Sequence, residues 1–167
     1  MTDIVAANVS ARILRRSMVN PASSESEAGS PWVVVDADIL IDVSTNADVP
    51  AGGIPLTNLF TSGATGDTGI DPAQEVFSTG LVSMVADSAE TTRVICEFLH
   101  TGATAATQIL AVYEIPADGG TNPEPLTPST GTLSDDAFLG DTTAFTTATV
   151  RVQLTGRLRA DVDVTSI

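Results

Sequence analysis

The only cysteine and the only histidine of the chain, Cys96 and His100, are the residues that could pair as nucleophile and base. Such a pair must lie within hydrogen-bond reach, about 2.6–3.2 Å. Residues 93–100 alternate between apolar and polar side chains, which predicts a strand, and a strand separates the two residues by about 13 Å. We therefore expect a buried thiol, a histidine at a strand end and no catalytic residues.

Asp36 and Asp38 could form a second reactive pair. On one face of a strand their separation is about 6.6 Å, a spacing that suits the two carboxylates of a glycoside hydrolase. A glycosidase cleft also uses aromatic platforms, and the chain has one tryptophan, one tyrosine and five phenylalanines. The solvent face of a strand is the simpler interpretation of both aspartates.

Metal and phosphate sites find little support in the sequence. One histidine and one cysteine cannot supply the ligands of a zinc site, and without a lysine the chain has no phosphate-binding P-loop. Carboxylates lie beside glycines at residues 66–71 and at Asp135, Asp136 and Asp141, but neither segment has the spacing of an EF-hand. We expect solvated turn aspartates, with a calcium site as the alternative, and no cofactor.

Arg12, Arg15 and Arg16 form the one basic cluster of the chain. A solvated strand end with local charge balance is one interpretation. The other is a docking site, because guanidinium groups make directional, bidentate pairs with carboxylates. Together with Trp32, which precedes a strong strand pattern, these arginines are the candidate residues for a partner interface.

The overall charge limits the class of partner. The chain of 167 residues carries 21 acidic and 7 basic side chains, a net charge of −14. An acidic body opposes the approach of a phosphate backbone, so we expect no nucleic-acid partner. No apolar run approaches the roughly 20 residues that cross a bilayer, and the N-terminus lacks the pattern of an export signal, so we expect no membrane association.

Alternation of apolar and polar residues with a period of two dominates the elements. It is clearest at residues 33–43, where Val33, Val35, Ala37, Ile39, Ile41 and Val43 face one way and three aspartates the other. A pair of strands is predicted at 93–100 and 108–115, the second with Ile109, Ala111, Tyr113 and Ile115 on one face. Residues 76–86 form a weaker strand interrupted by Gly80. Residues 150–164 form two strands, or one strand bent at Gly156. Residues 4–14 favour a strand over an amphipathic helix.

These elements predict an all-β fold, a two-sheet antiparallel sandwich with the jelly roll as one version of it. Long loops at 44–74 and 117–143 carry apolar residues, which we expect to pack on the domain: Leu56, Leu59, Phe60, Leu133, Phe138 and Leu139. Residues 1–20 are predicted as an N-terminal arm or strand and residues 21–167 as a single sandwich domain.

In overall manner the sequence resembles the capsid cement or decoration proteins of tailed bacteriophages. The resemblance lies in the β segments PWVVVDADILIDV and TTATVRVQLTGRLRADVDV, the filler TSGATGDTG and TGATAATQ, and the loop ADGGTNPEPLTPSTGTLSDD. It implies a non-enzymatic protein on the outer surface of a virion, assembled in the host cytoplasm. Such a protein bridges the major capsid protein or other subunits, often as a homotrimer. A glycan- or receptor-binding module, such as a tail-fibre tip or adhesin, is the alternative.

Overall fold

The computed structural model describes residues 2–19, 31–42, 44, 46–78, 82–84, 93–115, 127–128 and 147–163. Within them short strands alternate with turns and three 3-10 segments. The strands are β1 (Thr2–Asp3), β2 (Val9–Val19), β3 (Trp32–Asp42), β4 (Asn46–Asp48), β5 (Ile54–Pro55), β6 (Val76–Ser78), β7 (Val82–Met84), β8 (Arg93–His100), β9 (Gln108–Ile115), β10 (Thr127–Pro128) and β11 (Thr147–Arg157). The 3-10 segments are η1 (Ala6–Asn8), η2 (Thr57–Phe60) and η3 (Ala105–Thr107).

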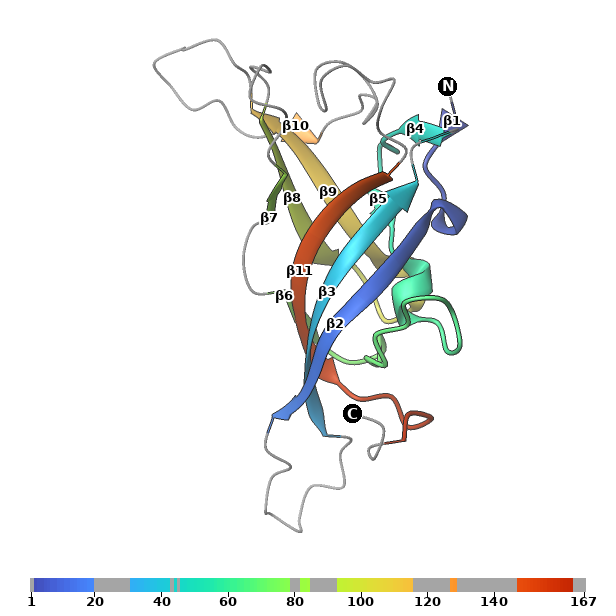
Figure 1. The fold of residues 1–167 in the computed structure, drawn as a ribbon, viewed down its shortest axis with the longest axis vertical. Coiled ribbons are helices and arrows are strands. Elements are labelled where there is room, and N and C mark those ends of the chain that lie inside the picture. The colour runs from blue at the N-terminus through green and yellow to red at the C-terminus, as the bar shows by residue number, and fades with distance from the viewer. Residues whose placement is uncertain are drawn as a thin grey trace.

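Two antiparallel sheets form the body of the fold, which confirms the predicted all-β sandwich. The first sheet has the order β2-β3-β11-β6. The second has the order β10-β9-β8-β7, with β5 also paired to β9. Figure 1 shows β2, β3 and β11 as one layer crossing in front of β8 and β9. Strands β1 and β4 form a small parallel pair, and the jelly-roll version of the sandwich stays a prediction.

Strand β3 is the centre of the first sheet and confirms the clearest sequence pattern. It pairs with β11 along its whole length on one side and with β2 on the other. Its alternate residues are fully buried against the second sheet, as predicted: Val33, Val35, Ala37, Ile39 and Ile41. Val43 lies outside the described residues. Burial of five β-branched or small side chains from one strand gives the sheet a fixed inner and outer face.

Strand β2 confirms the strand interpretation of the N-terminal segment, and the helix alternative is wrong. It begins at Val9 rather than Ile4 and runs further, to Val19, with the 3-10 turn η1 before it. Ile13 pairs with Ala37 and Arg15 with Asp36, so Leu14 is an extra residue in a β-bulge. Because of the bulge, each side chain after Leu14 lies on the face of the sheet opposite to the one that it would occupy in a regular strand.

Residues 76–86 and 150–164 depart from the simplest predictions. Instead of one interrupted strand, β6 pairs with β11 in the first sheet and β7 pairs with β8 in the second, so the chain changes sheets between them. Strand β11 continues through Gly156, and residues 159–163 form a turn rather than a second strand. A Cβ atom on Gly156 would lie 2.6 Å from Cγ2 of Ile70, so the glycine makes room for that neighbour.

Strands β8 and β9 pair in the predicted antiparallel way, from Arg93 with Ile115 to His100 with Gln108. The face of β9 that joins the core cluster is the one opposite to the predicted row of Ile109, Ala111, Tyr113 and Ile115. Leu110 and Val112 are buried in the core, in register with Phe98 and Cys96, while Ile109 and Ala111 face the other side. Both faces of this strand are apolar, so its sequence alone does not decide which one joins the core.

The loop between β4 and β6 packs as predicted, because its apolar residues Leu56, Leu59 and Phe60 are buried in the core cluster. The apolar residues predicted to anchor the loop at 117–143 lie outside the described residues. Phe60 also contacts Phe98 of β8, with ring centroids 6.0 Å apart. The loop thereby closes one end of the space between the sheets. None of the helical segments in the described ranges is long and apolar enough to cross a membrane.

Candidate functional site

The outer face of the first sheet gathers most of the positive charge of the protein. Cross-strand partners share a face, and the pairs Arg12 with Asp38, Arg15 with Asp36, Asp38 with Arg151, and Trp32 with Arg157 all face away from the core. Four of the seven basic residues therefore project from one side of an acidic protein. We call this surface the arginine face; its members are Arg12, Arg15, Trp32, Asp36, Asp38, Phe77, Arg151, Gln153 and Arg157.

Asp38 is the centre of the arginine face and links three strands. Its side chain is only 2% exposed because two guanidinium groups cover it. Nη2 of Arg12 donates to Oδ2 at 2.6 Å, and Arg151 donates from Nε to Oδ1 at 2.8 Å and from Nη2 to Oδ2 at 3.2 Å. The hydrogen bonds from Arg151 and then Arg12 lower the pKa of Asp38 to about 2. A carboxyl group held ionised in this way cannot serve as the general acid of a glycosidase.

The ion pairs of Asp38 with Arg12 and Arg151 make part of the free energy of unfolding depend on pH. A carboxylate with a lowered folded-state pKa stabilises the fold above its unfolded value of about 3.9, and this contribution disappears as the pH falls towards 2. We expect Asp38→Asn to unfold more easily than the wild type at pH 6, and the difference to shrink steadily between about pH 4 and pH 2. Urea unfolding followed across this range measures it. A difference independent of pH would contradict the role of the ion pair.

The neighbouring cross-strand row of the arginine face contains Arg15, Asp36 and Gln153, and fewer hydrogen bonds link its side chains than link those around Asp38. Nε2 of Gln153 donates to Oδ1 of Asp36 at 2.7 Å, and Nε of Arg15 donates to the hydroxyl of Ser17 at 2.8 Å. Asp36 and Asp38 thus occupy one strand face as predicted, but each has its own polar partner. They form a part of a surface network and not a converging carboxylate pair.

Aromatic side chains occupy one end of the arginine face. The rings of Trp32 and Phe77 stack with centroids 6.0 Å apart and an interplanar angle of 24°. The guanidinium of Arg157 lies 5.1 Å from the centre of the Trp32 ring, within the range of a cation–π contact. Phe77 remains 49% exposed, and Val19 beside them is also exposed. This end therefore presents an apolar patch next to fixed positive charge.

An open depression of about 500 Å³ lies at the other end of the same face. Ser10, Leu40 and Thr147 contribute to its lining together with Asp42 and Ser44. The carboxylate of Asp42 accepts hydrogen bonds from the backbone N–H and the hydroxyl of Ser44, which lower its pKa. Asp42 and Ser44 thus give the depression part of a polar lining.

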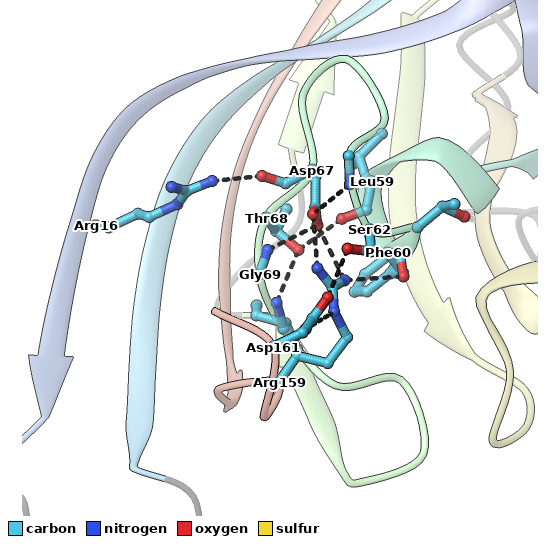
Figure 2. Close-up of polar contacts among 12 residues, drawn as sticks. Arg16, Leu59, Phe60, Ser62, Asp67, Thr68, Gly69, Arg159 and Asp161 are labelled. Atoms are coloured by element: carbon cyan, nitrogen blue, oxygen red, sulfur yellow. Dashed lines mark hydrogen bonds and ion pairs between the residues drawn. The ribbon is translucent and has the colours of Figure 1, made fainter. Parts of the chain in front are cut away.

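Arg16 does not belong to the arginine face, although the sequence groups it with Arg12 and Arg15. The bulge at Leu14 turns Arg16 to the other side of β2, where Nη2 donates to the backbone carbonyl of Asp67. Its Nε is buried without a hydrogen-bond partner among the described residues. Figure 2 shows Arg16 reaching from β2 towards this loop. Its role is to tie the loop to the first sheet.

Asp67 instead pairs with Arg159, which follows β11 (Figure 2). Nη2 and Nη1 of Arg159 donate to the two carboxylate oxygens of Asp67 at 2.6 and 3.1 Å. Nε of Arg159 donates to Asp161 at 2.6 Å, and Asp161 accepts a further bond from Ser62 at 2.5 Å. The bond to Asp67 is the largest cause of the raised pKa of Arg159. We call these four residues the Arg159 cluster.

The carboxylates of segment 66–71, the candidate calcium ligands, have protein partners in the structure. The carboxylate of Asp67 faces a guanidinium, and Asp71 accepts a hydrogen bond from the backbone N–H of Ala73 at 2.9 Å. No group of three or more potential metal ligands occurs among the described residues. The other candidate, Asp135, Asp136 and Asp141, lies outside them.

Cys96 and His100 are separate in the structure. Cys96 is buried in the core, and burial raises the pKa of its thiol to about 12, so it is protonated at neutral pH and unreactive as a nucleophile. Nδ1 of His100 lies 2.8 Å from Oε1 of Gln108, whose Nε2 donates to the carbonyls of Gly102 and Thr104. This arrangement orders the turn between β8 and β9.

Of the four residues predicted for a partner interface, Arg12, Arg15 and Trp32 lie on one surface, and Arg16 lies on the opposite side of β2. The structure adds three residues that sequence reasoning missed: Phe77, Arg151 and Arg157. Alternation along β11 places Arg151 and Arg157 on one face, and this pattern was visible in the sequence. The pairing of β11 with β3 joins positions more than a hundred residues apart, and no local pattern specifies it.

Comparison of the chain with protein-family models, with curated proteins and with solved structures finds no significant match.

Proposed function

We propose that the protein is a non-enzymatic structural component of a bacteriophage particle, where it decorates or cements the capsid and uses the arginine face to dock. The gathering of four of its seven arginines with Trp32 and Phe77 on one sheet face is the observation that carries this proposal. The partner is the major capsid protein or another virion subunit on the outer surface of the particle. Association of the chain with its own copies, as a trimer, belongs to the same proposal.

The composition of the arginine face supports a protein partner. Arginine, tryptophan and phenylalanine are enriched in protein interfaces, and tryptophan and arginine dominate their binding energy. A specific contact buries at least about 1,000 Å² in total, and a face formed by four strands offers surface of that order. Because β2, β3 and β11 are continuously paired, the side chains project from a rigid support. Little ordering is therefore needed on binding, which favours affinity.

The glycan-binding alternative receives less support from the same surface. A sugar-binding platform uses an open aromatic ring, whereas the half-buried Trp32 already contacts both Phe77 and Arg157. A glycan array with the wild type and Trp32→Ala tests this alternative. Strong binding that disappears in the variant would favour it over the capsid role.

Particles of the virus that encodes the chain, prepared with and without it, test the proposed function. We expect particles that lack the protein to be less resistant to heat and to low salt: they should release their genome at a lower temperature, and at a salt concentration that complete particles still tolerate. Added purified protein should restore the resistance. The matched control is protein with Trp32→Ala and Arg157→Ala, which should restore less. Equal resistance of the two kinds of particle, together with a monomeric mass in native mass spectrometry, would overturn the proposal.

A further inference from the structure

The row formed by Arg12, Asp38 and Arg151 contains more hydrogen-bond donors than it uses. Arg12 donates to Asp38 from Nη2 alone, and Arg151 donates from Nε and Nη2. A guanidinium has five N–H donors. The remaining donors of both groups, Nη1 of Arg151 among them, have no acceptor among the described residues. The side chains of Arg12 and Arg151 are 65% and 69% exposed, so these donors face the solvent.

Asp38 holds both guanidinium groups in place. Long arginine side chains normally lose conformational freedom when they bind, and this loss weakens the interaction. Here the buried carboxylate fixes one edge of each group, while the other edge stays open. One negative charge lies between two positive charges, so the row retains a net charge of +1. It is therefore a rigid, positively charged set of donors on a protein whose net charge is −14.

The side chains around Arg12 and Arg151 indicate which acceptor group their open donors would bind. A guanidinium edge matches the two oxygens of a carboxylate or a phosphate. A nucleic acid would place a continuous line of phosphates along the face, where it would meet Asp36 and Asp42 as well as the acidic remainder of the molecule. A protein surface can place isolated carboxylates at the row and apolar side chains against Phe77 and Val19, which are exposed.

We propose that Arg12 and Arg151 form a docking site for carboxylate side chains of a partner protein whose aspartates or glutamates lie beside apolar residues. This inference deepens the proposed function, on which it rests, by naming the chemistry of the partner. Asp38 acts as the residue that positions the two arginines. Salt weakens the contact, because the pair is exposed on the side that binds.

A short capped peptide in which glutamates alternate with leucine and threonine tests the site, with its glutamine version as the control probe. We expect the glutamate peptide to bind the wild-type protein about tenfold more tightly than the glutamine peptide, and to shift the NMR signal of the Arg151 Nε–H. The neutral-row variant Arg12→Gln, Asp38→Asn, Arg151→Gln leaves no unpaired charge behind and should lose that preference. Arg12→Lys with Arg151→Lys keeps the charge but not the planar donors, and should bind more weakly than the wild type.

Several outcomes would overturn this inference. They are equal binding of the two peptides, an unchanged preference in the folded neutral-row variant, and tighter binding of a single-stranded oligothymidylate than of the glutamate peptide. The proposed function fails separately. If wild-type protein stabilises particles and the neutral-row variant does so equally, the docking site is wrong and the capsid role stands. If the peptide results hold but particles never require the protein, the capsid role is wrong and the carboxylate site stands.

Discussion

Replacing Arg159 with alanine is expected to lower the free energy of unfolding by about 3 kcal/mol, a value typical of breaking a mostly buried ion pair. The side chains of Arg159 and Asp67 are 15% and 17% exposed, so water screens their interaction poorly. Arg159 also donates to the carbonyl of Phe60 and to Asp161, and its replacement removes the side-chain bonds that it makes to Phe60 and Asp67 of the loop. Backbone N–H groups of Gly63 and Gly69 still bind the Asp67 carboxylate, which limits the loss.

Urea unfolding monitored by tryptophan fluorescence measures this effect, because the chain has a single tryptophan. Arg15→Ala is the matched control. Arg15 is exposed and bonds to Ser17 through one nitrogen, so its replacement should change the stability by less than about 0.5 kcal/mol. Equal effects of the two substitutions would show that the Arg159 cluster contributes nothing special to the fold.

Gly66→Ala is expected to cost about 3 kcal/mol or more, or to prevent folding. The φ angle of Gly66 is +84°, in the left-handed region that side chains rarely adopt. A Cβ atom there would lie 2.7 Å from Cα of Ala11, and it would overlap the backbone nitrogen and oxygen of the same residue. Since this neighbour is part of β2, neither side can move without disturbing the first sheet.

Substitutions at two other glycines separate the cost of the positive φ angle from the cost of the steric overlap with β2. Gly63 has a φ angle of +74° but nothing within 4 Å of an added Cβ, so Gly63→Ala should show only the conformational cost, about 1 kcal/mol. Gly52 has neither restriction, and Gly52→Ala should be close to neutral. Thermal unfolding of the three variants gives the order. A Gly66→Ala protein as stable as Gly63→Ala would contradict the close approach of the loop to β2.

Alternation with a period of two was sufficient to predict the class of fold. It also predicted the orientation of strands whose two faces differ chemically. Strand β3 has aspartates on one face and β-branched residues on the other, so its orientation is fixed by the hydrophobic effect alone. Strand β9 is apolar on both faces at Ile109–Val112, and there the inner face depends on its pairing with β8. Local pattern therefore predicted the element but not its orientation.

The candidate site was only partly predictable, because it depends on contacts between distant segments. Arg12, Arg15 and Trp32 could be named from the sequence, but the bulge that removes Arg16 from the same face has no distinct signal in the residues around Leu14. Asp38 looked like a solvated carboxylate. It is buried because Arg12 and Arg151, from strands far apart in the chain, both cover it. Similarly, the glycine-rich segment 66–71 suggested a cation site, and only the structure places Arg159 there.

A cryo-electron microscopy reconstruction of the particle that carries the protein tests most directly whether the arginine face is its docking surface. We expect the outer side of β2, β3 and β11 to lie against a neighbouring subunit, with Arg12 and Arg151 next to carboxylate side chains and Trp32 covered. A reconstruction in which this face points to the solvent while another surface holds the chain to the shell would contradict the assignment.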